Sequence, residues 1–473
     1  MSEFDLVIRN GRLVTATESL NADLAIQGEK IAAIGHGLTG RQTIDAGGML
    51  VTPGAVDVHV HMETNVGNGI TTSDDFFTGT RAAAIGGTTA IVDFVDAAPD
   101  QPLLDALAQR RRRADQCSVI DYALHMVIRP PDLRKLDELP ALAAAGCSSF
   151  KLFMAYPFRL DDGQLVQALE AIRDVGGMPV VHAENWDVIS LLIKRNLEAG
   201  RTGPRWHPRS RPEILEGEAA GRLIDIARFV GVPVHIFHVS CRSVVDRIAT
   251  AKAEGLSVTG ETCPHYLYLT QEAYEAEGVL GMLPVCSPPL RPEAERLALW
   301  DALAGGDLDI VSTDHGAYMM ADKNRGAGDF SAIPGGVPSI EMRFSALYAG
   351  VQRGLFSENR WVEICCTAPA DRVGLQNKGR LNPGADADLV IFSPEKRKLL
   401  STKTLHENTD WTPYEGIDIR GWPAMTISRG EVIAREDQFL GEMGRGRYID
   451  RKPHGGSAGR KSVAGSEAAE GRG

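Results

Sequence analysis

Side chains that bind metal ions or move protons recur at the ends of short apolar segments of this chain. The first such segment ends His59-Val60-His61. Alternate residues of a strand share one face, so both imidazoles can reach one metal ion. Lys151 lies inside the apolar run Ser149-Phe150-Lys151-Leu152-Phe153, where a lone ammonium would be costly. Three more such residues follow later apolar segments: His182, His238 and Asp314.

Each of these residues also has an ordinary structural explanation. A lone His-x-His is often structural, and Lys151 alone could be a salt-bridged lysine whose stem packs on apolar surface. His182 and His238 could each be a hydrogen-bonded core histidine. Their joint occurrence at successive segment ends favours an active site over these separate explanations. His235 is an odd number of residues from His238, so we expect it to face the other side and to be structural.

The elements that must position these residues alternate between strand and helix. Eight strands are predicted, at Val56–His61, Thr89–Val95, Tyr122–Ile128, Ser149–Ala155, Pro179–Ala183, Val234–Val239, Ser257–Thr262 and Asp309–Thr313. Helical patterns lie between them, for example at Thr78–Ile85, Leu103–Ala114, Leu165–Val175 and Glu293–Ala304. This alternation predicts a parallel sheet and, with eight repeats, an α/β fold of the (β/α)8 TIM-barrel type. Catalytic groups of such barrels gather at the C-terminal ends of the strands.

Two β-rich segments flank the predicted barrel. Residues 4–52 read as short strands separated by turn residues such as Asn10-Gly11, and residues 379–434 show the same pattern of short strands and turns. We expect them to pair into a small β-sandwich built from both chain ends. The predicted domains are residues 1–54 plus 379–450 for the sandwich, 55–378 for the catalytic barrel and 451–473 for a disordered tail rich in Gly, Ala, Ser and charge.

Composition excludes several classes of protein. The 473 residues include 50 basic and 62 acidic ones, for a net charge of −12, so there is no basic surface for nucleic acid. The seven cysteines are scattered and form no C-x-x-C motif, which favours reduced thiols. The chain has no signal-peptide pattern at its start and no long uncharged apolar run. We therefore expect a cytoplasmic protein with no membrane span.

Longer motifs resemble one family, the dihydropyrimidinases and D-hydantoinases of the amidohydrolase superfamily. Allantoinases are close relatives of that family. The resemblance covers residues 4–453. The matching motifs are T-P-G-A-V-D-V-H-V-H at 52–61, S-D-D-F-F-T-G-T-R-A-A-A at 73–84, G-G-T-T at 86–89, K-L-F-M-A-Y at 151–156, H-A-E-N at 182–185, G-E-T-C-P at 260–264, C-S-P-P-L-R at 286–291, P-G-A-D-A-D-L-V at 383–390 and T-P-Y-E-G at 412–416.

The resemblance implies a centre of two divalent metal ions, usually Zn²⁺. His59 and His61 would bind the first ion, and His182 and His238 the second. Lys151 would be an N6-carboxylysine that bridges both ions. Asp314 would bind the first ion and shuttle a proton, and Tyr156 would donate a hydrogen bond to the developing oxyanion.

The expected reaction is hydrolytic opening of a dihydropyrimidine or 5-substituted hydantoin ring to an N-carbamoyl amino acid. By resemblance, backbone groups near Ser287 and Gly335 would hold the amide edge of the ring, and the loop at 62–70 would line a pocket for its substituent together with Phe153 and Phe158. Residues 62–70 and Gly335 depart from the family pattern, and His265 is an allantoinase-like feature. Allantoinase-like activity and cyclic imide hydrolysis therefore stay open as alternatives, with a non-catalytic scaffold as a remote one. A homotetramer is also expected from the resemblance.

Overall fold

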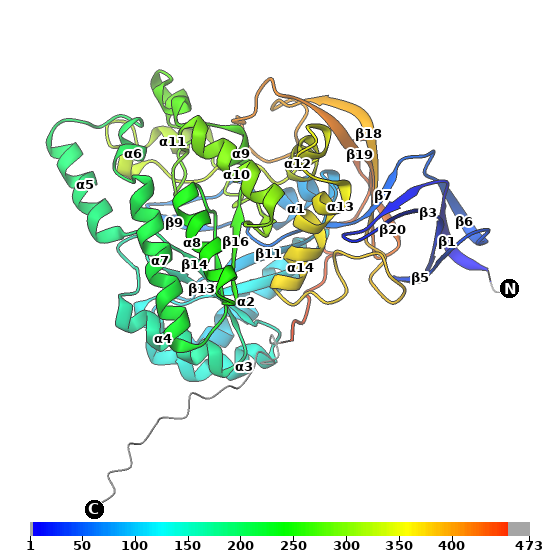
Figure 1. Ribbon diagram of the computed structural model, residues 1–473, viewed down its shortest axis with the longest axis horizontal. Helices are drawn as coiled ribbons and strands as arrows, with labels where there is room; N and C mark the ends of the chain where they lie inside the picture. The colour runs from blue at the N-terminus through cyan, green and yellow to red at the C-terminus, as the bar shows by residue number, and fades with distance from the viewer. Residues whose placement is uncertain (1–2, 453–473) are drawn as a thin grey trace, which may run out of the picture.

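An eight-stranded parallel sheet curls into a nearly closed barrel at the centre of the structure (Figure 1). The computed structural model describes residues 3–452, so most of the predicted disordered tail lies outside the described residues. The strands lie side by side in chain order: β8 (Ala55–Asp57), β11 (Thr88–Val95), β12 (Asp121–Val127), β13 (Ser149–Phe153), β14 (Met178–His182), β15 (Val234–Ile236), β16 (Val258–Thr262) and β17 (Ile310–Val311). A parallel bridge between Val60 and His315 joins the two outer ends of this sheet. The predicted barrel is confirmed.

Helices cover the outer side of the barrel, as they must where a parallel sheet is buried on both faces (Figure 1). The α-helices of residues 3–452, of which a few lie at the mouth of the barrel instead, are α1 (Phe76–Ile85), α2 (Leu103–Cys117), α3 (Leu139–Ala144), α4 (Asp162–Asp174), α5 (Trp186–Glu198), α6 (Trp206–Arg209), α7 (Glu213–Val230), α8 (Arg242–Ala253), α9 (Pro264–Tyr268), α10 (Glu293–Gly305), α11 (Met320–Asn324), α12 (Arg343–Gln352), α13 (Glu358–Val362) and α14 (Ala368–Arg372). Helix α1 begins where it does because Asp75 and Thr78 form a capping box, each side chain bonding the other's backbone N–H. The four helices named from the sequence are all present, with ends shifted by a few residues.

Both chain ends build the second part of the molecule, drawn in blue and orange in Figure 1. One sheet contains β5 (Lys30–Gly35), β4 (Asp23–Gln27), β1 (Phe4–Arg9) and β6 (Gly40–Asp45). The other contains β21 (Gln438–Phe439), β20 (Glu431–Arg435), β19 (Asp418–Ser428), β18 (Leu389–Leu399), β7 (Leu50–Pro53), β2 (Arg12–Val14) and β3 (Ser19–Asn21). Strand β7 pairs with both β2 and β18. The two sheets share one buried core, which includes Leu6 and Leu24 of the first and Leu13 and Ile391 of the second. The predicted sandwich is confirmed.

Six barrel strands end one to four residues earlier than predicted, and for β8 the difference matters for the site. Strand β8 ends at Asp57, whose carboxylate accepts hydrogen bonds from the backbone N–H of Thr313 (3.1 Å) and from its hydroxyl (2.6 Å). Hydrogen bonds to a side chain thus replace the backbone hydrogen bonds of the sheet at the point where the chain leaves it. As a result, His59 and His61 lie just beyond the strand end rather than within it.

The structure also bears on the expectations about cysteines and membranes. All seven cysteines are buried, and none forms a disulfide bond. Within residues 3–452 no helix is long and apolar enough to cross a membrane.

Candidate metal centre

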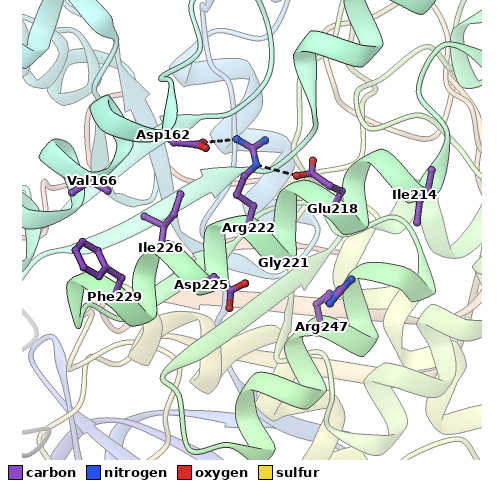
Figure 2. Close-up of a pocket in the computed structure, with 10 residues that line it drawn as sticks. All are labelled: Asp162, Val166, Ile214, Glu218, Gly221, Arg222, Asp225, Ile226, Phe229 and Arg247. Carbon is purple, nitrogen blue, oxygen red and sulfur yellow. Dashed lines mark hydrogen bonds and ion pairs between the residues drawn. The ribbon is translucent and has the colours of Figure 1, made fainter.

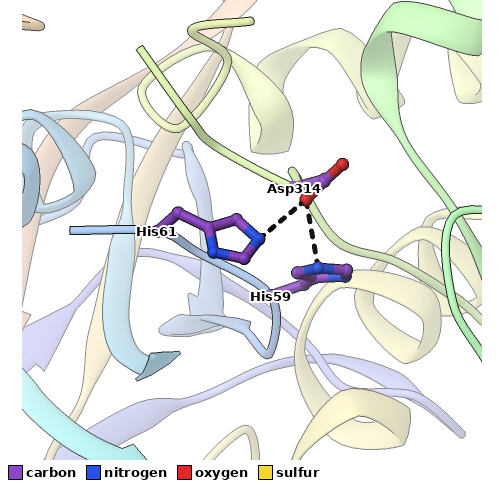
Figure 3. A group of neighbouring side chains, drawn as sticks. All are labelled: His59, His61 and Asp314. Carbon is purple, nitrogen blue, oxygen red and sulfur yellow. Dashed lines mark hydrogen bonds and ion pairs between the residues drawn. The ribbon is translucent and has the colours of Figure 1, made fainter. Parts of the chain in front are cut away.

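His59, His61 and Asp314 converge at the C-terminal mouth of the barrel (Figure 3). The Nε2 atoms of His59 and His61 lie 3.0 Å and 3.1 Å from the same oxygen, Oδ1 of Asp314. His59 is buried and His61 is partly exposed. Two imidazoles and one carboxylate are a donor set that suits Zn²⁺ and similar divalent ions. The structure thus brings together a candidate metal site from residues more than 250 positions apart in the chain.

A buried carboxylate orients His59 from behind. Oε1 of Glu261 lies 2.5 Å from Nδ1 of His59, and its other oxygen lies 3.3 Å from Nε2 of His235. Burial opposes ionisation of Glu261, but His59 and His235 outweigh it and lower the pKa of this carboxyl to about 2. Such a carboxylate fixes the tautomer and orientation of a metal-binding histidine.

The expectation that His235 faces away from the barrel interior is therefore wrong, although its role is structural. Its ring bonds Glu261 and also the hydroxyl of Thr259, with Nδ1 and Oγ1 2.8 Å apart. The alternation rule fails because β15 ends at Ile236 and the backbone leaves the strand conformation before His238.

His182 and His238 form a second pair of imidazoles beside the first group. Their ring centroids are 4.4 Å apart, and that of His238 is 5.5 Å from that of His59. Nε2 of His182 lies 2.6 Å from Oε2 of Glu184, which in turn pairs with Arg211. Among residues 3–452, Nδ1 of His238 is buried without a hydrogen-bond partner. A buried ring nitrogen without a partner is unusual in a protein, and a metal ion would supply one.

Lys151 lies close to both groups in an apolar and aromatic setting. Its Nζ is 4.2 Å from the centroid of the Phe237 ring and 4.8 Å from that of Phe153. Burial lowers the pKa of Lys151 to about 7. The same lysine affects the pKa values of His182 and His238, so it lies within electrostatic range of them. A neutral amine at this position can react as a nucleophile near neutral pH.

Three of the predicted site residues have strained backbone conformations. The φ angles of Tyr156, His238 and Asp314 are +71°, +40° and +49°. Residues other than glycine rarely adopt positive φ, and such strain clusters at functional sites. These conformations turn the side chains toward the mouth of the barrel at the points where strands give way to loops.

The six predicted metal ligands border one cavity of about 1130 Å³. Tyr156, Ser287 and Gly335 also line it, and the Tyr156 hydroxyl is hydrogen-bonded to Ser287. Burial raises the pKa of Tyr156 to about 12, so this hydroxyl stays protonated and can donate a hydrogen bond.

Part of the wall of this cavity is apolar, although the guanidinium of Arg129 lies over the Phe158 ring, 4.9 Å from its centroid. The hairpin of β9 (Asn65–Gly67) and β10 (Ile70–Thr71) contributes Val66 to its wall, and Phe153 and Phe158 contribute their rings. The ring centroids of the two phenylalanines are 5.2 Å apart. The loop that departs from the family pattern therefore forms part of the cavity wall.

A second hollow, of about 690 Å³, lies on the outer faces of α4, α7 and α8 (Figure 2). It contains none of the predicted site residues. Its central cation, Arg222, is already paired with Asp162 and with Glu218. Ile214 and Phe229 beside it are 68% and 79% exposed, so this face is apolar as well as charged.

The sequence reasoning assigned no role to Glu184, Glu261 or Arg211. The two glutamates stand in motifs that the resemblance used, H-A-E-N at 182–185 and G-E-T-C-P at 260–264. A carboxylate two residues after a candidate ligand was a usable signal for Glu184. Nothing in the local sequence pairs Glu261 with His59, because they are 202 residues apart.

Comparisons with known proteins agree with this geometry. Residues 50–433 match the amidohydrolase family. A D-hydantoinase of Geobacillus stearothermophilus is 43% identical over 457 residues, which cover 95% of this chain and 97% of the relative. The solved D-hydantoinase of Bacillus sp. AR9 has a TM-score of 0.92 and 41% identity, covering 95% of this chain and 99% of that one. The solved dihydropyrimidinase of Brevibacillus agri NCHU1002 has a TM-score of 0.92 and 40% identity, covering 94% of this chain and 98% of that one.

Proposed function

Since this chain belongs to the D-hydantoinase and dihydropyrimidinase group of the amidohydrolase family, we propose that it hydrolyses the C–N bond of a cyclic amide and releases an N-carbamoyl amino acid. The observation that carries the proposal is the group of His59, His61 and Asp314, which lies on the wall of a cavity large enough for a substituted ring. Every ligand position is filled, which argues against a scaffold that has lost its metals.

The donor set fits two divalent ions, for which Zn²⁺ is the proposed identity. His59, His61 and Asp314 would hold the first ion, and His182 and His238 the second. Lys151 would bridge them as a carbamate: its neutral amine would add CO2 and lose one proton, which gives the side chain a negative charge. The lowered pKa of Lys151, which burial causes, supports this reaction because only the neutral amine attacks CO2.

When bound, the two ions supply Lewis acidity that activates a water molecule and polarises the amide carbonyl. The Asp314 carboxylate accepts a proton from the attacking water and returns it to the ring nitrogen as the C–N bond breaks. The Tyr156 hydroxyl donates a hydrogen bond to the carbonyl oxygen as it gains negative charge. Backbone groups at Ser287 and Gly335 hold the amide edge of the ring.

The apolar part of the cavity wall supports a ring that carries a substituent. Val66, Phe153 and Phe158 offer apolar contact there, and the burial of such contacts adds about 25 cal/mol for each Å² removed from water. We therefore favour a 5-substituted hydantoin with an apolar substituent over unsubstituted dihydrouracil.

The test is ring opening by the metal-replete enzyme in bicarbonate, with kcat/KM compared across five substrates. They are dihydrouracil, hydantoin, an aromatic 5-substituted hydantoin, a cyclic imide and allantoin. The aromatic hydantoin is expected to give the highest kcat/KM. If allantoin were best, the allantoinase-like alternative, to which His265 points, would replace the hydantoinase proposal. No turnover of any of the five would refute cyclic amide hydrolysis.

A variant tests the proton shuttle separately. Asp314→Asn should abolish turnover while the metal content stays largely intact, because the amide can still ligate but cannot accept the proton. Wild-type-like activity in this variant would contradict the role given to Asp314.

The proposed homotetramer is supported by the resemblance and by the exposed apolar side chains Ile214 and Phe229 on α7. Light scattering coupled to gel filtration measures the mass directly, and a monomer at micromolar concentration would exclude it.

A further inference from the structure

Lys323 is a fully buried lysine outside the metal centre, in the short helix α11. Its Nζ donates three hydrogen bonds, all to backbone carbonyls: Val285 at 2.8 Å, Pro334 at 2.7 Å and Gly336 at 2.7 Å. Burial lowers the pKa of Lys323 to about 7, but the three carbonyls at its Nζ favour the charged form. The ammonium form has three N–H donors, so every donor of that form is used. Lys323 therefore has no N–H left for a substrate, and it does not line the cavity.

The three carbonyls belong to the two loops that the proposed function assigns to the substrate ring. Val285 precedes Ser287 by two residues, and Pro334 and Gly336 flank Gly335. The backbone N–H of Gly336 also bonds the carbonyl of Val285, with N and O 3.0 Å apart. One ammonium thus ties both loops together at a single point.

Because the peptide bond is planar, the hydrogen bond from Lys323 to the Pro334 carbonyl also fixes the direction of the Gly335 N–H. In a trans peptide the C=O and the following N–H point opposite ways, so the N–H of Gly335 points away from Lys323. Gly335 itself lines the cavity, and a Cβ added there would lie 4.0 Å from the Ser287 nitrogen. Among residues 3–452 no backbone carbonyl accepts a hydrogen bond from the Gly335 N–H, which leaves that donor free for a ligand.

Neighbouring contacts hold Lys323 and the turn in place. The Nζ lies 5.4 Å from the Tyr318 ring centroid and 5.6 Å from that of Trp411, distances at which aromatic faces attract a cation. Gly336 has φ of +147°, and a Cβ there would come within 2.5 Å of the Gly316 carbonyl oxygen. The turn is therefore packed against the segment that follows Asp314.

We propose that Lys323 is a positioning residue that orders the backbone groups of Ser287 and Gly335 for binding the amide edge of the substrate ring. The inference rests on the proposed function for the identity of the ligand, but the ordering of the two loops by Lys323 stands on the three hydrogen bonds alone.

The test compares Lys323→Met, which replaces the stem of the side chain as far as Cε and removes all three donors, with Lys135→Met. Lys135 is the matched control, because it is also buried and also bonds backbone carbonyls, those of Ala98 and Gln101, yet it does not line or border the cavity. Lys323→Met should raise KM for the best substrate about tenfold or more, because the substrate loses the equivalent of about one hydrogen bond. The value of kcat should change less than about threefold. Metal content should not change, and Lys135→Met should leave both constants as in the wild type.

Hydrogen–deuterium exchange of residues 284–288 and 333–337 provides a readout that needs no substrate. Exchange there should accelerate in Lys323→Met and not in Lys135→Met. An unchanged KM, a loss confined to kcat, or unchanged exchange in these segments would each overturn the inference. If Lys323→Met does not fold, Lys323→Gln, which keeps two N–H donors, replaces it and should give an intermediate KM. A wild-type enzyme inactive on every cyclic amide would refute the proposed function, while the exchange experiment would still decide whether Lys323 orders the loops.

Discussion

Lys151 and Lys378 are both buried, but their surroundings push their pKa values in opposite directions. Lys151 faces aromatic rings, and burial lowers its pKa to about 7. Burial also opposes the charge of Lys378, but Asp388, Asp121 and Asp386 lie 2.7, 2.6 and 2.9 Å from its Nζ and raise its pKa above the usual range. One lysine is thus poised to be neutral, and the other is a permanent cation.

The presence or absence of a resident cation also decides which of two side-chain clusters can bind a metal ion. The carboxylates of Asp121, Asp386 and Asp388 are as close together as the donors of His59, His61 and Asp314. The first cluster already holds the ammonium of Lys378, and the guanidinium of Arg429 also pairs with Asp121. Donor geometry alone does not make a metal site, because the charge balance of the cluster decides whether a cation gains by entering it.

The largest effect is expected from Lys151→Ala. Without the carbamate that we propose as a bridge, kcat should fall by about 10³-fold or more, equivalent to about 4 kcal/mol of transition-state stabilisation. Metal content, measured by mass spectrometry of the purified protein, should fall as well. Added acetate should restore part of the activity, since it supplies a carboxylate to the space that the side chain leaves. Full activity in this variant without acetate would contradict the bridging role.

Lys378→Met is the counterpart in the other cluster. It leaves the buried carboxylates of Asp121 and Asp388 and the partly exposed Asp386 without their ammonium. Such a loss lowers the free energy of unfolding by about 3–5 kcal/mol. Urea unfolding measures this change, and kcat/KM of the folded enzyme should stay near the wild-type value.

The same variant also tests the argument from charge balance. Once Lys378 is gone, Ca²⁺ should bind the oxygen ligands of the three aspartates and raise the Tm of the variant but not that of the wild type. If Ca²⁺ has no effect on the variant, then the geometry of this cluster, rather than its resident ammonium, excludes the metal.

Glu261→Gln tests the carboxylate behind His59. The amide keeps the shape but loses the charge that orients and strengthens the imidazole as a ligand, so metal affinity should fall about 10- to 100-fold. Competition with a chromogenic chelator measures the affinity. Glu216→Gln is the control, because Glu216 is equally buried but pairs with Arg291 instead of a candidate ligand. An equal loss of metal affinity in both variants would show a general effect on stability.

Much of this fold could be predicted from the sequence, because its signals are local. Apolar runs of strand length alternate with helical patterns, and the order of strands in a barrel follows their order in the chain. Strand ends were less predictable. Strand β8 ends where Asp57 accepts hydrogen bonds from Thr313, which lies 256 positions away and just beyond β17, and no local pattern reveals this.

The candidate site could be predicted because its residue types rarely occur together at the ends of successive strands. Histidines and a lysine at successive strand ends are an unusual coincidence, so their meeting could be anticipated. The distant partner of His59 could not be anticipated, since a glutamate such as Glu261 looks the same in a sequence whether it faces solvent or a histidine. The positive φ angles of Tyr156, His238 and Asp314 were equally hidden, because residue type alone disfavours that conformation.

The smallest expected effect comes from Asp386→Asn, which removes one charge from the edge of the Lys378 cluster. Asp386 pairs with Lys378 and with Lys30, at 2.5 Å for the latter, and its side chain is 18% exposed. The variant should lose about 1 kcal/mol of stability at pH 7, since it loses the charge and its single carbonyl oxygen can accept from only one of the two ammonium groups.

The pH dependence of this loss identifies its origin. Burial opposes ionisation of Asp386, but Lys378 and Lys30 outweigh it and lower its pKa below the usual value. An acid with a lowered pKa in the folded state stabilises the protein above its unfolded pKa of about 3.9, and that stability is lost as the pH falls through the folded value. The difference in unfolding free energy between wild type and variant should therefore be constant from pH 7 to about 5 and shrink toward zero below about pH 3. Asp371→Asn, at an exposed pair with Arg380, should change stability by less than about 0.5 kcal/mol at any pH. A deficit for Asp386→Asn that persists at low pH would mean that packing, and not charge, holds this aspartate in the cluster, and would weaken the argument that charge balance distinguishes the two sites.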